Sequence, residues 1–248
     1  MAAAPTRSPP PPIDGSHALF LDVDGTLLEF APRPDDVSVP AALRQVLSDL
    51  QYRLEGAVAL VSGRPLGVLD ALFRPLQLPA AGLHGLELRN GQHEQPAPVA
   101  PAALATVLAQ ARAFTAHRSG TVVEDKGSSI GLHWRNAPVH EVAMRRFAED
   151  ALERLPDYRL QLGNQVAELR PQGADKGDAI AVLIDQPPFR GRTPVFVGDD
   201  LTDEHGFAVI NARAGISVLV GNREPSAARH GLADTGAVLG WLQQGANG

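Results

Sequence analysis

Two aspartates, Asp22 and Asp24, directly follow the apolar residues 18–21 and precede Gly25 and Thr26. A short, bounded apolar run is typical of a buried strand, and strand residues two apart face the same side. Both carboxylates can therefore point into one site where the strand ends. The alternative is an ordinary turn, because Asp and Gly are common turn residues.

Similar polar clusters follow two further apolar runs. Ser62-Gly63-Arg64 follows residues 57–61, and Gly198-Asp199-Asp200 follows residues 193–197, with Asp203 close behind. Lys176 lies near the start of a predicted helix. Ligands of open parallel sheets bind beyond the carboxyl ends of the strands, so these side chains are expected at one site.

A cluster of carboxylates around one point needs a cation, since the charges would otherwise repel one another. Oxygen-only ligands suit Mg²⁺, which also binds substrate phosphate oxygens. A lysine such as Lys176 can neutralise phosphoryl charge, and the Ser62 hydroxyl can donate to a phosphoryl oxygen. Backbone amides of the turn Asp24-Gly25-Thr26 can do the same.

The two leading aspartates can then have different roles. Asp22, kept ionised by a metal and a lysine, can attack phosphorus and form an acyl phosphate. Asp24 can donate a proton to the leaving oxygen and later accept one from the attacking water. Two close carboxylates in different environments can hold such distinct protonation states.

The elements that position these residues alternate between strand and helix. Apolar spacing predicts helices over residues 39–54, 65–73, 175–184, 201–210 and 238–243, and strands over residues 57–61, 80–83, 193–197 and 215–220. A hairpin is expected around Asn90-Gly91 and a linker over residues 92–101. Such alternation predicts a doubly wound parallel sheet, an α/β fold.

The pattern changes in the middle of the chain. Helices are expected over residues 102–117 and 139–155, and strand pairs over residues 121–124 with 129–134 and 158–162 with 165–169. This order is typical of helices on a small antiparallel sheet. We therefore predict an α/β core from residues 13–90 and 172–248, with a smaller α+β domain, residues 91–171, inserted between them.

Composition excludes several classes of protein. The chain has 248 residues, 44% hydrophobic and 20% charged, which predicts a packed core. Its net charge of −6 argues against a general nucleic-acid binder, and the lack of cysteine excludes disulfides and thiolate metal sites. No apolar run has the length of a membrane span. The Ala/Pro-rich residues 1–12 lack the apolar core of a secretory signal and are expected to be a disordered tail, so we expect a cytoplasmic protein.

The polar clusters resemble the four motifs of the haloacid dehalogenase superfamily of phosphatases, in the superfamily's order. The matching residues are Asp22-Val23-Asp24-Gly25-Thr26, Ser62-Gly63-Arg64, Lys176 and Gly198-Asp199-Asp200-Leu201-Thr202-Asp203-Glu204. The resemblance implies a Rossmann-like core with an inserted cap, a nucleophile at Asp22 and an acid/base at Asp24. It also implies Mg²⁺ held by Asp22, the Asp24 carbonyl and Asp199. Asp200 and Asp203 would act through water or by supporting the ligands.

A closer resemblance, over roughly residues 17–220, is to trehalose-6-phosphate phosphatases. It is carried by residues 82–87, 123–127, 132–135, 163–171 and 199–204. This resemblance implies that the cap residues Glu124, Lys126 and Glu168 hold the hydroxyls of the distal glucose. Sites built to bond hydroxyls reject analogues that lack them. Without the resemblance, Glu124 and Lys126 would be predicted as exposed charges beside a turn, and Glu168 could be exposed or buried.

Three functions are compatible with these patterns. The first is a Mg²⁺-dependent phosphatase for trehalose 6-phosphate, in which Gly25, Thr26, Gly63 and Arg64 also contact the substrate. The second is a phosphatase for another sugar phosphate, such as sucrose or mannosylglycerate phosphate. The third is a catalytically silent phospho-sugar sensor, against which the intact acidic and basic set argues.

The expected partner is a small sugar phosphate rather than nucleic acid or membrane. A monomer is the default expectation because nothing in the sequence specifies an oligomer.

Overall fold

The computed structural model describes residues 7–31, 36–91 and 93–248, which form two compact units. The core unit comprises the described residues of 1–30, 37–96 and 174–248, and the inserted unit those of 31–36 and 97–173. The boundaries predicted from the sequence, at 90/91 and 171/172, differ from this division by six and two residues, and the sequence did not assign residues 31–36 to the insertion.

The core unit is built on an eight-stranded sheet, counted over the described residues, in the order β12-β11-β10-β1-β2-β3-β4-β5. Its strands are β1 (His17–Leu21), β2 (Val58–Val61), β3 (Ala80–Gly82), β4 (Glu87–Asn90), β5 (His93–Gln95), β10 (Thr193–Gly198), β11 (Ile216–Val220) and β12 (His230–Leu232). All neighbours pair in parallel except β3 with β4 and β4 with β5. The predicted α/β class is confirmed.

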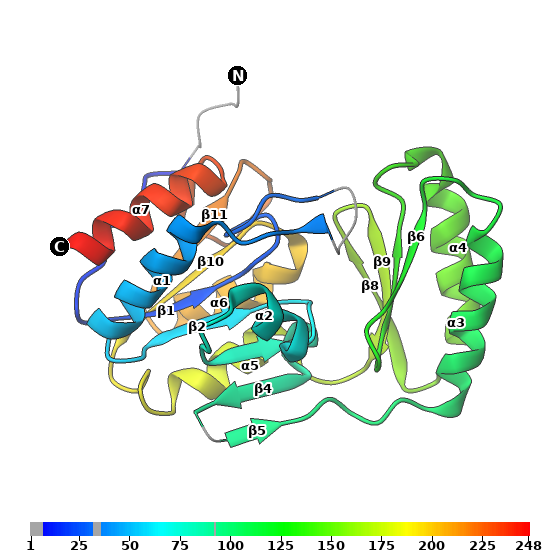
Figure 1. Ribbon diagram of the computed structural model, residues 1–248, viewed down its shortest axis with the longest axis horizontal. Coiled ribbons are helices and arrows are strands. Elements are labelled where there is room, and N and C mark those ends of the chain that lie inside the picture. The colour runs from blue at the N-terminus through cyan, green and yellow to red at the C-terminus, as the bar shows by residue number, and fades with distance from the viewer. Residues whose placement is uncertain (1–6, 32–35, 92) are drawn as a thin grey trace. The chain divides into compact units, whose positions relative to one another are not determined.

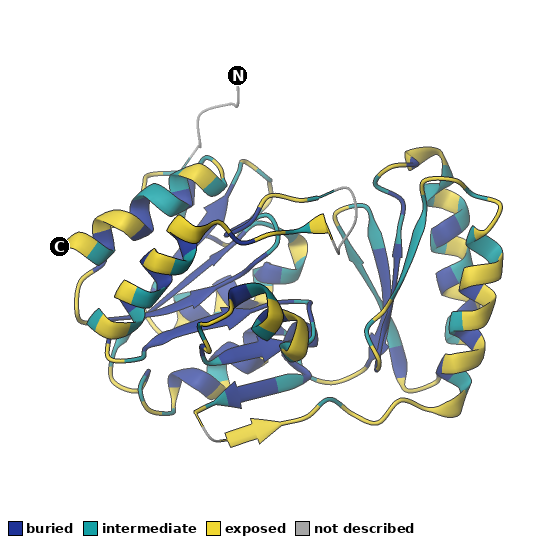
Figure 2. Ribbon diagram, viewed as in Figure 1, coloured by how far each residue is buried: buried dark blue, intermediate teal, exposed yellow. Residues whose placement is uncertain are grey.

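Five α-helices of the described core unit complete this fold: α1 (Ala41–Arg53), α2 (Leu66–Phe73), α5 (Lys176–Ile184), α6 (Glu204–Ala212) and α7 (Thr235–Asn247). Short 3₁₀ turns, η2 (Leu83–Gly85) and η4 (Leu201–Asp203), follow β3 and β10. Helices α1 and α7 pack together, as do α5 and α6, on opposite faces of the sheet (Figure 1). The strands between them are buried on both faces (Figure 2), which explains their continuous apolar runs.

The order of the strands decides where a ligand can bind. From β1 the chain crosses to β2 on one side, while β10 pairs with β1 on the other. In register, Leu21 lies beside both Leu60 and Val197. The carboxyl ends of β1, β2 and β10 are therefore adjacent at a topological switch point, where open α/β sheets bind ligands.

The inserted unit has a four-stranded antiparallel sheet, again counted over the described residues, in the order β6-β7-β9-β8. Its elements are α3 (Ala102–Thr115), β6 (Val122–Asp125), β7 (Ile130–His133), η3 (Pro138–His140), α4 (Glu141–Leu152), β8 (Tyr158–Gly163) and β9 (Val166–Pro171). Ile130, Leu132 and Leu169 share one apolar cluster with Trp134 and helix residues such as Met144. Because strand residues alternate between faces, the other face of this sheet carries polar side chains.

Three sequence predictions need correction. Residues 7–12 are not a disordered tail, because Gly231 donates its amide to the Ser8 carbonyl and Trp241 donates its indole N–H to the Pro11 carbonyl. These bonds join the segment to edge strand β12, which sequence patterns missed, and to α7, which is longer than predicted. The other half of the tail, residues 1–6, lies outside the described residues.

The segment predicted as a linker, residues 92–101, contains β5, which forms a hairpin with β4. Gln92 lies outside the described residues. All three β5 residues are exposed, so the strand lacks the apolar alternation by which strands are recognised in sequences. The third correction is that the helix expected over residues 201–210 begins as the 3₁₀ turn η4 before α6.

Candidate active site

Lys176 lies at the centre of the candidate site in the core unit. Its Nζ is 2.7 Å from Asp22 Oδ1 and 2.6 Å from Asp203 Oδ1. The three side chains are 4%, 5% and 0% exposed. Lys176 is the first residue of α5, Asp22 follows β1 and Asp203 ends η4, so three distant segments converge as the sequence predicted for the carboxyl edge of the sheet.

Both carboxylate oxygens of Asp203 contact other groups of the protein. Its Oδ2 accepts the backbone amides of Asp199 and Asp200, each at 2.9 Å, while Oδ1 faces Lys176. A Cβ at Gly198 would lie only 2.5 Å from Asp203 Cγ, so only glycine fits there. Asp203 therefore fixes the loop after β10, which carries Asp199.

Asp22, Asp199 and Asp203 bring carboxylate oxygens within 4.8 Å of one another. Burial raises the pKa of Asp22 to about 7, although the positive charge of Lys176 works to lower it. Burial, with the charges of Asp22 and Asp203, raises the pKa of Asp199 to about 9. Burial alone would lower the pKa of Lys176, but the charges of Asp203 and Asp22 outweigh it and raise that pKa. The raised pKa values mean that these carboxylates resist being ionised together beside a single ammonium, and a bound cation would favour their ionised forms.

The turn after β1 holds Asp199 closely. A Cβ at Gly25, whose φ is +90°, would lie 2.3 Å from Asp199 Oδ2, so glycine is required there. The Thr26 hydroxyl, fully buried, lies 3.4 Å from Asp199 Oδ1. The Gly25 amide donates to the Leu28 carbonyl at 2.7 Å. That donor is therefore already used in this structure, and the contact of the Gly25 amide with a phosphoryl group stays a prediction.

Arg64 forms a bidentate ion pair with Asp24. Its Nε and Nη2 lie 2.7 Å from Asp24 Oδ2 and 2.8 Å from Oδ1. The Arg64 amide also donates to the Ser62 hydroxyl at 3.1 Å, and Ser62 is fully buried. Gly63 between them leaves room for His84, whose Nε2 would be 2.4 Å from a Cβ at that position. Sequence reasoning placed Arg64 on the substrate and missed its pairing with the predicted acid/base.

A second buried charge cluster lies within the inserted unit. Lys126 Nζ is 2.6 Å from Glu168 Oε2 and 4.0 Å from Glu124 Oε2. The Ser129 hydroxyl donates to Glu168 Oε1 at 2.9 Å. The Lys126 and Glu168 side chains are only 8% and 5% exposed. The alternative of exposed charges beside a turn is therefore wrong, and the cluster is paired as buried charges must be.

Strand register explains how these residues share one face. Gly131 on β7 lies opposite Glu124 on β6 and Glu168 on β9. A Cβ at Gly131 would lie 2.9 Å from His133 Nε2 and 3.2 Å from Glu124 Oε2, so glycine leaves room for both side chains. His133 Nε2 is 2.8 Å from Glu124 Oε2. Sequence reasoning did not single out His133, although it follows Gly131 by two residues and so shares its face.

The Glu124 carboxylate is held ionised by its neighbours. Burial works to raise its pKa, but the hydrogen bond with His133 and the positive charge of Lys126 outweigh burial, and the net pKa is lowered. A carboxylate of this kind accepts hydrogen bonds and donates none. The polar face of the sheet therefore offers anionic acceptors beside a buried ammonium.

An α/β core with this carboxylate–lysine site and an inserted α+β unit defines a phosphatase of the haloacid dehalogenase class. The chain belongs to the trehalose-phosphatase family, whose model matches residues 20–235. It is therefore a phosphatase enzyme, as the sequence predicted. None of the helices in the described ranges is long and apolar enough to cross a membrane.

Individual relatives agree with this family. The chain is 42% identical to the trehalose-6-phosphate phosphatase of Escherichia coli strain K12 over 94% of this chain and 88% of that protein. It is 43% identical to a protein of Sinorhizobium fredii named a probable trehalose-phosphate phosphatase, over 84% of this chain and 79% of the other. The C-terminal domain of a C. albicans trehalose-6-phosphate phosphatase has the same fold, with a TM-score of 0.82 at 19% identity over 94% of this chain and 93% of that one.

Proposed function

We propose that this enzyme hydrolyses trehalose 6-phosphate to trehalose and phosphate through a covalent aspartyl phosphate on Asp22. The observation that carries the mechanism is the buried contact of Lys176 with Asp22 Oδ1. It leaves Asp22 Oδ2 buried with no hydrogen-bond partner among the described residues. That oxygen is available to attack phosphorus. Lys176 would neutralise part of the phosphoryl charge, and the Ser62 hydroxyl would donate a hydrogen bond to a phosphoryl oxygen.

The residues of the core unit fit a bound Mg²⁺. The donor set consists of oxygen atoms, and three clustered carboxylates, Asp22, Asp199 and Asp203, face the single ammonium of Lys176. Oxygen donors with few carboxylates suit Mg²⁺. We propose Asp22, the Asp24 carbonyl and Asp199 as its ligands, with Asp200 and Asp203 in support. When bound, the ion would stabilise the charge that develops on the phosphoryl oxygens.

Asp22 and Asp24 together can carry out both half-reactions of this mechanism, with Asp24 returning to its starting protonation state. As the bond from Asp22 to phosphorus forms, the bond to the sugar oxygen breaks and Asp24 gives that oxygen its proton. Water then attacks the phosphorus and gives a proton to Asp24, and the bond to Asp22 breaks to release phosphate. Both Asp24 oxygens are paired with Arg64 in this structure. We therefore propose that Arg64 transfers from Asp24 to the phosphoryl group on binding, since a guanidinium also pairs bidentately with phosphate.

The inserted unit is proposed to act as the cap that recognises the sugar. Family membership and the names of the relatives support trehalose 6-phosphate as the substrate. Glu124, Lys126 and Glu168 supply two anionic acceptors and one ammonium donor on a single sheet face. Such groups form hydrogen bonds with sugar hydroxyls. A ligand without hydroxyls would leave these groups buried and unpaired, which costs binding free energy.

One assay separates this proposal from the other two functions. Phosphate release is measured with trehalose 6-phosphate, sucrose phosphate, mannosylglycerate phosphate and a small aryl phosphate. We expect the highest kcat/KM with trehalose 6-phosphate. Preference for another sugar phosphate would overturn the substrate assignment, and no turnover with any of them would indicate a silent sensor.

A further inference from the structure

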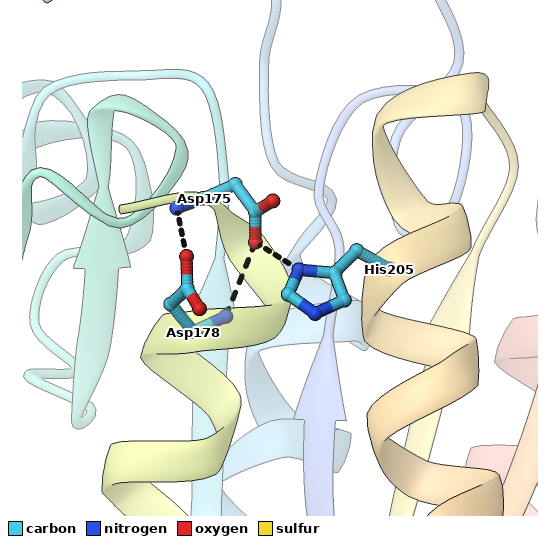
Figure 3. Close-up of side chains that lie close together, drawn as sticks. All are labelled: Asp175, Asp178 and His205. Carbon is cyan, nitrogen blue, oxygen red and sulfur yellow. Dashed lines mark hydrogen bonds and ion pairs between the residues drawn. The ribbon is translucent and has the colours of Figure 1, made fainter. Parts of the chain in front are cut away.

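Asp175, Asp178 and His205 meet where helices α5 and α6 begin (Figure 3). Asp175 is the N-cap of α5: its Oδ1 accepts the Asp178 amide at 3.1 Å, and its own amide donates to Asp178 Oδ2 at 3.0 Å. His205 Nδ1 lies 2.6 Å from the same Asp175 Oδ1. The carboxylates are thus used in capping the helix, and the cluster is not assigned as a metal site.

The position of this contact in the chain links it to catalysis. Asp175 directly precedes Lys176, and His205 follows Asp203 by two residues. The start of α5 and the start of α6 are therefore joined twice, once by Lys176 with Asp203 inside the protein and once by Asp175 with His205 nearer the surface. The outer contact fixes the backbone from which the Lys176 side chain extends.

The fit around this contact is tight. A Cβ at Gly177 would lie 2.5 Å from His205 Nδ1 and 2.9 Å from the His205 carbonyl carbon. A Cβ at Gly85, whose φ is +99°, would lie 2.3 Å from the Asp175 carbonyl oxygen. Glycines thus let η2 and α6 approach the first turn of α5, and a shift of that turn would open these contacts.

The chemistry of the pair defines which atom donates. Burial works to raise the pKa of Asp175, but hydrogen bonds from His205 and from the Asp178 amide outweigh it and lower that pKa. The ionised carboxylate can only accept. His205 Nδ1 is therefore the donor, whether the ring is neutral or protonated, and an asparagine amide nitrogen can reach a similar position.

From these contacts we propose that His205 is a positioning residue for Lys176, an inference that rests on the proposed role of Lys176 in phosphoryl transfer. By holding Asp175, His205 keeps the first turn of α5 in the place where the ammonium of Lys176 reaches both Asp22 and Asp203. Loss of this contact weakens the stabilisation of phosphoryl charge in the transition state more than the binding of the substrate.

The test compares His205→Ala, His205→Asn and a matched control, Arg213→Ala. Arg213 pairs with Asp185 at 2.8 and 3.0 Å and joins the opposite ends of the same two helices. We expect His205→Ala to lower kcat by roughly three- to tenfold, the scale of one hydrogen bond, with KM changed less than about twofold. The loss should be equal for trehalose 6-phosphate and an aryl phosphate, and His205→Asn should restore most of it.

Thermal unfolding separates positioning from stability. Both alanine variants should lower Tm by similar amounts, whereas only His205→Ala should lower kcat. An unchanged kcat in His205→Ala, or an equal loss in Arg213→Ala, would overturn the inference. If the wild-type enzyme released no phosphate from trehalose 6-phosphate, the proposed substrate would be wrong, but the comparison on the aryl phosphate would still decide the role of His205.

Discussion

Replacing Glu168 with glutamine removes the charge of a carboxylate that is 5% exposed while keeping its shape and one oxygen acceptor. Glu168 accepts hydrogen bonds from Lys126 Nζ at 2.6 Å and from the Ser129 hydroxyl at 2.9 Å. Hydrogen bonds to charged groups contribute about 1.5–3 kcal/mol each. Losing one such contribution to the sugar site is expected to lower kcat/KM for trehalose 6-phosphate by roughly ten- to a hundredfold.

The same change should have little effect on a small aryl phosphate. That substrate has no distal glucose, so binding energy from the inserted unit cannot contribute to its turnover. We expect its kcat/KM to fall by less than about threefold, because one charge change away from the reacting atoms leaves the core site intact. Both substrates are measured on the same enzyme preparations at the same Mg²⁺ concentration.

Two further variants complete this experiment. Glu168→Ala should behave like the glutamine variant on activity but unfold at lower temperature, because it removes the buried carboxylate that lies 2.6 Å from the ammonium of Lys126. Glu141→Gln is the matched control: it neutralises a 42% exposed carboxylate of the same unit, paired with Arg145 on α4. It should change neither substrate's kinetics. Equal losses on both substrates in Glu168→Gln would refute a sugar-binding role and indicate a role in folding instead.

Three other predictions concern the core site and the pH dependence of stability. A chelator should abolish phosphate release and added Mg²⁺ should restore it, because a cation at the clustered carboxylates of Asp22 and Asp199 would stabilise the phosphoryl charge; full activity in chelator would contradict the metal site. Asp22→Asn should reduce kcat by more than about a thousandfold while far-UV circular dichroism is unchanged, since the amide is near-isosteric but is no nucleophile; near-normal turnover would exclude the covalent route. The folded-state pKa of Glu124 is below its ordinary value of 4.5, so its contribution to stability is present above pH 4.5 and is lost as the pH falls through the folded-state pKa. Denaturant unfolding of wild type and Glu124→Gln should therefore converge in stability as the pH falls, and a stability difference that does not change with pH would contradict this pairing.

Much of the fold follows from short-range patterns in the sequence. The strands β1, β2 and β10 are continuous apolar runs, and each ends at the polar residues Asp22, Ser62 or Asp199. The alternation of strand and helix is sufficient to predict a parallel sheet, and parallel strands bring their carboxyl ends to one edge. Edge elements were harder to predict, because β5 is exposed and β12 has only three residues.

The sequence by itself determined the α/β class, and it predicted the insertion and the residues of the candidate site, because strand ends and motifs are local features of the chain. Only the tertiary structure decided how those residues pair. Lys176 is 154 positions from Asp22, Arg64 is 40 from Asp24 and Glu168 is 42 from Lys126. Such pairs depend on strand register, on glycines such as Gly131 that leave room for neighbouring side chains, and on which donors are already used, as at Gly25. None of these features follows a repeating pattern in the sequence. Hydrogen bonds depend on the distance between two groups in space, not on their separation along the chain.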